Sequence, residues 1–297
     1  MKNMRISTKV LAEICGVSQG TVDRALHGRY GINPETQQKI LKTARMFGYR
    51  NEFTQVRAKL IGIIVFNLKN DYFTSLISSI QAELEKNGYM LTVMLSNYDK
   101  QKELTAIHSL YDAGVDGIIL CSANAGDAYG HYLSTLNIPI IAVGNQLPSI
   151  PYIGIDDYSA MLALSEYVKT LGYKKIIYFS PAILKEDAYA QKQRAEGFRK
   201  AMVDFKNYKI VTDISDLDTQ YDDNTAIICS TDLYAMRVFM KTNHAHIFGF
   251  DGIDLIKKLN MPIKSVAYST DDIAHEIITS ICTNRKENVF VKYRLPL

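Results

Sequence analysis

From Leu60 onward, short apolar runs alternate with longer stretches of helical periodicity, and this alternation constrains the fold more than any other feature. Apolar runs without a polar face are typical of strands buried on both faces, and intervening helices place such strands in a parallel sheet. The predicted strands are residues 60–66, 90–95, 117–121, 139–143, 175–179, 226–229 and 245–250. The predicted helices are residues 72–87, 100–113, 157–171 and 271–284.

The strand and helix pattern runs twice, once ending near Val143 and again starting near Tyr173. A chain of 297 residues is long enough for two or three domains with a sizeable core. We therefore predict an α/β fold in which residues 60–297 form two doubly wound lobes with a cleft between them.

The N-terminal part follows a different pattern, that of three short helices. Ser7 and Ser18 are suited to cap the first two helices, Gly16 provides the turn between them, and Asn33 with Pro34 opens the third. The expected core consists of Leu11, Ile14, Val22, Ala25, Leu26, Ile40, Leu41, Ala44 and Phe47. Two helices joined by a short glycine turn and completed by a third form the helix-turn-helix pattern.

Charge separates the same two regions. Residues 1–59 contain eleven Lys or Arg and four Asp or Glu, a net charge of +7; the whole chain carries +3, which leaves −4 for the rest. A small helical domain without a nucleic-acid partner would satisfy the helix pattern alone. The charge favours a domain that binds the phosphates of DNA.

The N-terminal residues resemble the lactose-repressor-like (LacI/GalR) family of transcription regulators. The matching motifs are Leu11-Ala12, Gly16-Val17-Ser18, Thr21-Val22-x-Arg24-x-Leu26, Asn33-Pro34-Glu35-Thr36 and Gly48-Tyr49. The resemblance implies a helix-turn-helix DNA-binding domain at residues 1–49 and a periplasmic-binding-protein-like effector domain at residues 60–297. In that fold the chain crosses between the lobes three times, here near Asp157, Ser269 and Asn288. The implied lobes are residues 60–156 with 270–287, and 157–269 with 288–297.

In this family the second helix enters the major groove of DNA. The resemblance implies base contacts at Gln19, Gly20 and Arg24. We also expect DNA contacts at Ser7, Ser18, Thr21, His27 and, in the connector, Arg57. Arg24 is expected to contact guanine, because Arg can donate two hydrogen bonds to its O6 and N7 atoms. Gly20 offers little beyond backbone, so Gln19 and Arg24 are expected to carry most of the direct readout. The alternative for Arg24 is a surface ion pair with Asp23 or Glu35.

The connector, residues 50–59, departs from the family. The usual regulators have a longer linker with a hinge helix whose leucine enters the minor groove. Val56 or Leu60 could supply that wedge, but neither aligns with it. We therefore expect a different docking of the N-terminal domains or an unusual spacing of the DNA half-sites.

Ligands of parallel sheets bind beyond the carboxyl ends of the strands. The candidate effector residues at those ends, with one Arg from a following helix, are Tyr72, Phe73, Asn124, Asp157, Arg194, Asp232 and Asp251. The resemblance implies contacts at Phe73, Arg194, Asp232 and Asp251. Carboxylates, an Arg and an aromatic ring suit a sugar, since they accept from hydroxyls, donate to oxygens and cover C–H surface.

Two substitutions and one alternative limit this interpretation. Asp71 and Thr231 stand where the family has proline and asparagine, so the identity of the effector does not carry over. Each carboxylate also precedes a helix, so its alternative role is that of an N-cap.

Several other functions are disfavoured. His244-x-His246 lacks a third ligand and the acidic run 213–223 lacks the central glycine of a calcium loop, so we expect no metal. The chain has no GxGxxG, GxxxxGK[ST] or GxSxG motif, so we expect no cofactor and no enzyme activity. Four separated cysteines in apolar segments, no secretory signal and no membrane-length apolar run place the expected protein in the cytoplasm, with no membrane partner.

Three functions remain: a ligand-responsive, sequence-specific transcription regulator, a solute-binding protein with an incidental basic head, and a cytoplasmic α/β enzyme. We predict the first, acting as a repressor, because the charge split argues against the second and the lack of a catalytic constellation against the third. The expected partners are double-stranded DNA with a near-palindromic operator, a sugar-like effector and a second copy of the chain in a homodimer.

Overall fold

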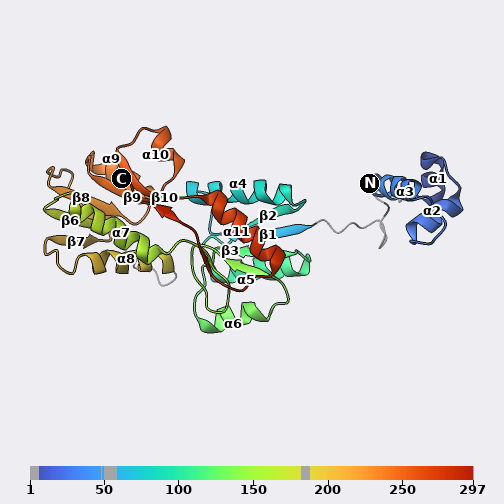
Figure 1. Cartoon of the computed structure of the whole chain (residues 1–297), viewed down its shortest axis with the longest axis horizontal. Helices are drawn as coiled ribbons and strands as arrows, with labels where there is room; N and C mark the ends of the chain where they lie inside the picture. Colours follow the sequence, from blue (N-terminus) through green and yellow to red (C-terminus); the bar gives the residue numbers. More distant parts are fainter. Residues whose placement is uncertain (1–6, 48, 50–58, 182–187, 297) are drawn as a thin grey trace. The chain divides into compact units, whose positions relative to one another are not determined.

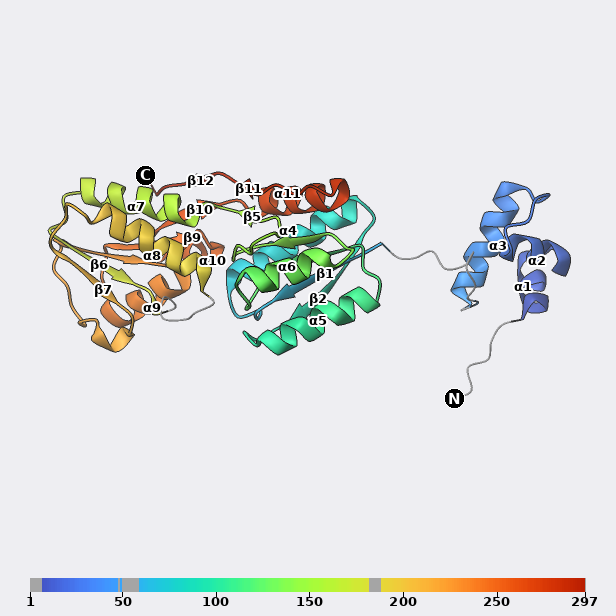
Figure 2. The ribbon, with the colours of Figure 1, turned by 90° about the horizontal axis from the view of Figure 1, so that it is seen from below.

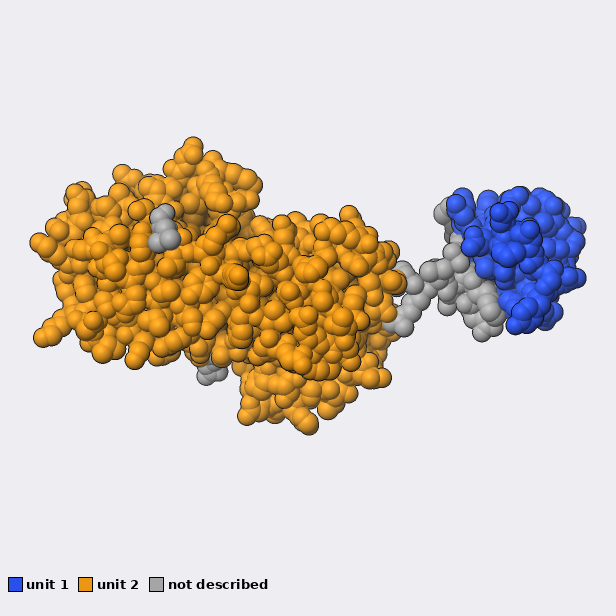
Figure 3. Space-filling model, viewed as in Figure 1, with its two compact units in different colours: residues 1–58 blue, residues 59–297 orange. Residues whose placement is uncertain are grey.

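The computed structural model describes residues 7–47, 49, 59–181 and 188–296. The chain forms two compact units, Met1–Ala58 and Lys59–Leu297 (Figure 3). Each unit has its own hydrophobic core.

The first unit contains α1 (Thr8–Cys15), α2 (Gln19–Leu26) and α3 (Pro34–Met46). The three predicted caps are confirmed: the side chains of Ser7, Ser18 and Asn33 accept hydrogen bonds from Val10 N, Thr21 N and Glu35 N at 3.3, 3.1 and 2.8 Å. Gly16 has a φ of 70°, which the turn between α1 and α2 requires. The predicted three-helix arrangement is therefore present.

The core of this unit differs from the prediction at two positions. Ile14 is 45% exposed and Phe47 is 51% exposed. The buried face of α1 runs through Leu11, Ala12 and Cys15, and this rotation turns Ile14 toward solvent. Phe47 lies beyond the last residue of α3, outside its buried face.

The first lobe of the second unit is built on a parallel sheet in the order β2-β1-β3-β4. Its strands are β1 (Leu60–Val65), β2 (Met90–Leu95), β3 (Gly117–Leu120) and β4 (Ile140–Ala142). The helices α4 (Asp71–Lys86) and α11 (Thr270–Thr283) cover one face of this sheet. The helices α5 (Lys100–Asp112) and α6 (Asp127–Thr135) cover the other (Figures 1 and 2).

The second lobe is built on a sheet in the order β12-β10-β9-β8-β6-β7, parallel except for β12. Its strands are β6 (Lys175–Phe179), β7 (Tyr208–Val211), β8 (Thr225–Cys229), β9 (Ile247–Asp251), β10 (Ile263–Tyr268) and β12 (Tyr293–Arg294). The helices α7 (Asp157–Thr170) and α8 (Tyr189–Ala201) cover one face, and α9 (Asp232–Thr242) and α10 (Asp254–Lys258) the other. A 3-10 turn, Ile214–Asp216, follows β7.

The chain passes between the lobes at three places. The strands β5 (Ile153–Gly154) and β11 (Val289–Phe290) pair with each other in two of the crossings, and the third joins β10 to α11. The crossing from β10 to α11 explains how α11, late in the sequence, packs on the first lobe beside α4 (Figure 1).

The predicted α/β fold is confirmed, and the predicted strands and helices are present with ends shifted by at most two residues. The strands β7 and β10 were not predicted. Tyr208 and Lys209 of β7 are exposed at a sheet edge, and only Ile263 and Val266 of β10 are buried, so neither strand is a continuous apolar run.

Candidate functional site

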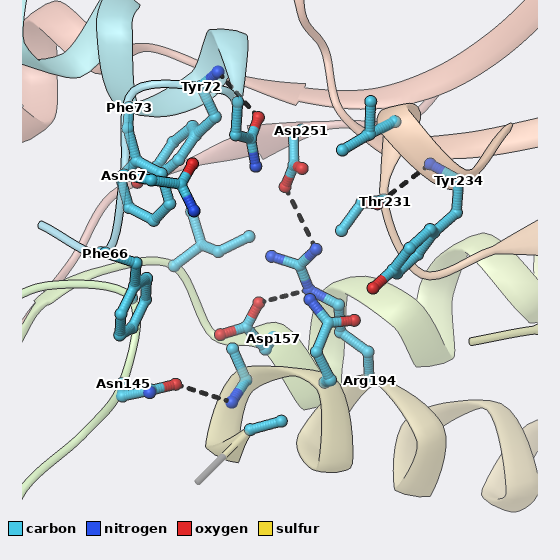
Figure 4. A pocket seen from close by; sticks show the side chains of 18 of the residues that line it. Phe66, Asn67, Tyr72, Phe73, Asn145, Asp157, Arg194, Thr231, Tyr234 and Asp251 are labelled. Carbon is cyan, nitrogen blue, oxygen red and sulfur yellow. Dashed lines mark hydrogen bonds and ion pairs between the residues drawn. The ribbon is translucent and has the colours of Figure 1, made fainter. Parts of the chain in front are cut away.

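A cavity of about 370 Å³ lies between the two lobes, at the carboxyl ends of strands from both sheets (Figure 4). The first lobe contributes residues that follow β1, β2 and β4, among them Phe66, Asn67, Lys69, Tyr72, Phe73, Tyr98 and Asn145. The second contributes Asp157, Gln191, Arg194, Thr231, Leu233, Tyr234, Asp251 and Tyr268. The volume is within the range of small-molecule sites, roughly 300–1,000 Å³.

Arg194 holds the charged end of this cavity together. Its Nε donates to Asp157 Oδ1 at 2.8 Å, and its Nη1 donates to Asp251 Oδ1 at 3.1 Å and to the Ser230 carbonyl at 2.6 Å (Figure 4). The guanidinium also lies over the Phe250 ring, with Cζ 3.8 Å from its centroid. Three different segments, α7, α8 and the end of β9, are thereby fixed to one another.

The two carboxylates of this cluster are buried beside a single Arg. Burial raises the pKa of Asp157 to about 6, against the lowering effect of Arg194. Burial also raises the pKa of Asp251, while Arg194 and a 3.0 Å hydrogen bond from the Tyr268 hydroxyl oppose that rise. Burial lowers the pKa of Arg194, but Asp157 and Asp251 more than offset this, so the guanidinium stays charged.

Asp251 has a strained backbone. Its φ of 114° lies in a region that residues with a side chain rarely adopt. Such strain persists only where the surroundings hold the residue firmly, and it concentrates at functional sites. The hydrogen bonds of Asp251 to Arg194 and Tyr268 are the interactions that hold it here.

Aromatic rings form the wall opposite Arg194. The Tyr72 ring contacts Phe73 of the same helix at 5.3 Å and Tyr268 of the second lobe at 5.8 Å between centroids. Burial raises the pKa of Tyr72. Tyr72 therefore links the lobes at the back of the cavity and presents an uncharged phenol there.

Two predicted effector residues do not line the cavity. Asn124 Nδ2 donates to Glu103 Oε1 at 3.0 Å, and this buried carboxylate also accepts from Ser122 Oγ at 2.7 Å and Tyr129 Oη at 2.5 Å, and from Ala123 N. The polar residue after β3 thus completes a network inside the first lobe, which corrects the expectation that Asn124 contacts a ligand.

Asp232 is fully buried next to β9. Its Oδ1 accepts from Ser265 Oγ at 2.6 Å and its Oδ2 from Ile253 N at 2.8 Å. A Cβ on Gly249 would come within 2.0 Å of Asp232 Oδ1, so only glycine fits beneath it. Burial and the Asp251 charge raise the pKa of Asp232 to about 7. Asp232 therefore joins α9 to β10 and to the start of α10, and it does not line the cavity, where it was predicted to contact a ligand.

Tyr72, Phe73, Asp157, Arg194 and Asp251 are the predicted residues that the structure brings together at the cavity. For Asp157 and Asp232 the N-cap role proposed as an alternative is taken by the preceding residue: Asp156 Oδ1 accepts from Ser159 N at 2.9 Å, and Thr231 Oγ1 from Tyr234 N at 3.3 Å. The expectation that ligands bind beyond the carboxyl ends of the strands should also have pointed to Asn67, Tyr98 and Asn145, which follow β1, β2 and β4. No sequence signal pointed to Gln191.

In the first unit, most of the predicted DNA contacts lie on α2 or at its ends, and Ser7 lies at the start of α1. Ser18 caps the helix and Gln19 Nε2 donates to Thr8 Oγ1 at 2.9 Å, while Gln19, Gly20, Arg24 and His27 are exposed. Asp23 pairs with Arg29 at 3.3 Å and with His27 at 3.2 Å. Among the described residues no ion pair of Arg24 is found, so the alternative role, a surface ion pair with Asp23 or Glu35, is not observed. The predicted contact Arg57 lies outside the described residues.

The part of the chain that the structure describes shows no cluster of three His, Cys, Asp or Glu side chains placed to hold a metal. No helix in that part is long and apolar enough to cross a membrane. The cavity itself combines a fixed positive group, two carboxylates, several amides and aromatic rings. It is equipped to bind a polar, uncharged molecule with apolar faces.

Two lobes joined by three crossings, with a polar cavity between them, define the class of two-lobed ligand-binding domains. The family model described as periplasmic binding proteins and sugar binding domain of LacI family matches residues 58–244. The chain belongs to this family.

Individual relatives agree with this assignment. The chain is 25% identical over 282 residues to the sucrose operon repressor of Staphylococcus xylosus, with 87% of each chain covered. It is 23% identical over 302 residues to catabolite control protein A of Priestia megaterium, covering 91% of this chain and 90% of that protein.

Solved structures share the fold. The lac repressor dimer bound to operator and the anti-inducer ONPF has a TM-score of 0.75 and 16% identity, with 98% of both chains covered. A periplasmic binding protein/LacI transcriptional regulator from Alkaliphilus metalliredigens, complexed with D-xylulofuranose, has a TM-score of 0.66 and 21% identity, covering 80% of this chain and 97% of that one.

Proposed function

We propose that the protein is a transcription repressor whose affinity for operator DNA is set by a sugar-like effector bound between the two lobes. The observation that carries this proposal is the cavity around Arg194, on a chain that also has a basic three-helix unit. The relatives named as repressors of sugar operons support the same function.

In this proposal residues 1–49 bind DNA, residues 50–59 connect, and residues 60–297 bind the effector. Asp157 and Asp251 accept from effector hydroxyls, Arg194 donates to an oxygen, and Tyr72 and Phe73 cover C–H surface. Arg24 and Gln19 contact base edges from α2 in the major groove. Ser7, Ser18, Thr21 and His27 lie at or near the ends of α1 and α2, where they can contact the DNA backbone.

Two copies of the chain would place two reading helices on the half-sites of a near-palindromic operator in the cytoplasm. The effector contacts both lobes, so it stabilises the closed arrangement relative to the open one. Its effect on DNA affinity can be no larger than its differential affinity for these two states.

The test is a selection of bound fragments from random duplex DNA, followed by titration with sugars. A preferred sequence is expected whose affinity falls steeply with salt, because bound Lys and Arg release counterions from DNA. Arg24→Ala should lose roughly 1–3 kcal/mol of base discrimination and keep effector binding. The matched control is Arg199→Ala, which removes an exposed Arg from α8. Equal binding to all duplexes with and without sugars would contradict the proposal.

A further inference from the structure

One enclosed polar atom at the cavity has no partner. In the part of the chain that the structure describes, the side-chain carbonyl oxygen of Gln191, Oε1, is buried and accepts no hydrogen bond, and Gln191 lines the cavity. The other described side-chain atoms that are buried without a partner are hydroxyl oxygens of residues that do not line it, namely Ser165, Tyr178, Ser180, Ser230 and Ser280. The Gln191 amide is therefore the unsatisfied group at the wall of the site.

This arrangement of the Gln191 amide is unfavourable in the absence of a ligand. Folding has removed the hydrogen bonds that its oxygen makes to water, and nothing replaces them. A buried hydroxyl group can rotate to find an acceptor, whereas an amide oxygen has to receive a donor from a neighbour. The Nε2 atom of the same amide is not buried in this way. The amide thus has one accessible end and one end that lacks a donor.

Arg194, one helical turn further along α8, leaves the Gln191 oxygen without a donor. Residues three apart share one face of a helix, and both of these residues line the cavity. The Nε and Nη1 atoms of Arg194 donate instead to Asp157, Asp251 and the Ser230 carbonyl (Figure 4). These bonds fix the face of α8 that borders the cavity. They hold the backbone of Gln191 in place while its side chain keeps no protein partner.

A ligand with hydroxyl groups offers what the Gln191 amide lacks. An amide both donates and accepts hydrogen bonds, and so does a hydroxyl group. Two adjacent hydroxyl groups match the two ends of an amide, since one of them donates to Oε1 while the other accepts from Nε2. The side-chain torsions of glutamine let the amide turn toward a ligand while the helix stays in place.

We propose that Gln191 determines the specificity of the site, because its amide binds two adjacent hydroxyl groups of the effector beside Arg194. This inference rests on the proposed function, to which it adds the side chain that selects the pattern of hydroxyl groups. An analogue without one of the two hydroxyl groups leaves one end of the amide unpaired, so it binds more weakly.

The experiment measures by calorimetry the affinity of the full chain for D-glucose, D-galactose, D-mannose, D-xylose, D-ribose, sucrose and maltose. The monodeoxy analogues of the sugar that binds most tightly are then compared with that sugar. Loss of either of two adjacent hydroxyl groups is expected to weaken binding about tenfold. Whether Gln191 causes these losses is decided by a variant.

Gln191→Met keeps the length of the side chain and removes the amide. It should bind the sugar about tenfold more weakly than the wild type, and loss of either adjacent hydroxyl group should then weaken binding little further. Without ligand its Tm should rise by about 2–4 °C, because the unpaired oxygen is gone. Gln193→Met is the matched control: it makes the same change on the same helix at a residue that does not line the described cavity, and it should bind like the wild type.

Two results would overturn this role of Gln191 and leave the proposed function standing. In the first, Gln191→Met binds the sugar as tightly as the wild type does. In the second, Gln191→Met loses the same factor in affinity for the sugar and for every deoxy analogue, which would mean that the change disturbs packing rather than one set of hydrogen bonds. If no sugar in the panel binds to the wild type, the proposed class of effector is wrong, and the role of Gln191 with it.

Discussion

The two lobes contribute different chemistry to the cavity between them. The second lobe provides the ion cluster of Arg194, Asp157 and Asp251, which is buried and joined by direct hydrogen bonds. The first lobe provides aromatic rings and amides, and it keeps its own buried carboxylate, Glu103, inside a separate network. The buried ion cluster is thus confined to the second lobe, whereas aromatic rings and amides line the cavity from both lobes, Tyr268 and Gln191 among them in the second.

The largest expected effect comes from removing the cation of the second lobe. Arg194→Leu leaves Asp157 and Asp251 buried without their cation, which should destabilise the effector unit by about 3–5 kcal/mol and abolish the ligand response. Chemical denaturation and calorimetry measure the two effects. Arg199→Leu, on the exposed side of the same helix, is the control. Wild-type ligand affinity in Arg194→Leu would show that the ion cluster is not part of the site.

In the first lobe, Glu103→Gln should lower the free energy of unfolding without changing the affinity for the ligand. The carboxylate accepts from Ser122, Ala123, Asn124 and Tyr129, and an amide cannot accept all of these bonds, so a loss of about 2–3 kcal/mol is expected. Denaturation gives the stability and calorimetry the affinity, with the exposed Glu196→Gln as the control. A large loss of ligand affinity at unchanged stability would mean that this network belongs to the site after all.

Asp232 should make the free energy of unfolding of the second lobe depend on pH. Its folded pKa of about 7 lies above that of a free Asp, so the folded state holds a proton that the unfolded state has released. The contribution of Asp232 to the free energy of unfolding is therefore largest at low pH and falls as the pH rises toward 7. In Asp232→Asn this dependence is removed, so between pH 5 and 8 the variant should gain about 2 kcal/mol relative to wild type.

Denaturation curves at several pH values measure that difference. Asp254→Asn, at the exposed start of α10, is the control and should follow the wild type. Parallel stability curves for wild type and Asp232→Asn would contradict the raised pKa.

The smallest expected effect concerns a link between the lobes. Asn145 donates to the Ser122 carbonyl at 2.8 Å in the first lobe, and its Oδ1 accepts from Ala190 N of α8 at 3.3 Å (Figure 4). Asn145→Ala should lower the free energy of unfolding by about 1 kcal/mol. It should also weaken the closure of the two lobes that the ligand induces, which small-angle scattering measures as a change in the radius of gyration. Asn207→Ala, which breaks a hydrogen bond within one lobe, should close normally.

Much of the fold could be predicted because the relevant signals are local. Apolar runs such as residues 60–65 and 175–179 can be read as buried strands, and the caps Ser7, Ser18 and Asn33 depend only on neighbours within three residues. The strand β7 was missed because it lies at a sheet edge, where exposed residues remove the apolar pattern. The strand β10 was missed because only two of its six residues are buried.

The site was predicted only in part, because the order of side chains in space depends on packing between distant segments. Asp157, Arg194 and Asp251 were found since strand ends and a family motif marked them. Asn124 and Asp232 were placed at the cavity by the same rule, but each hydrogen-bonds with a side chain from another element, Glu103 and Ser265 respectively.

The sequence by itself determined the basic three-helix unit, the alternation of strands and helices, and the residue types available at the strand ends, because these follow from periodicity, caps and charge. Only the tertiary structure decided which of those side chains face the ligand and which satisfy one another. The physical reason is that a buried polar group must find a partner, and whether that partner is a ligand or a neighbouring side chain is set by which elements pack together.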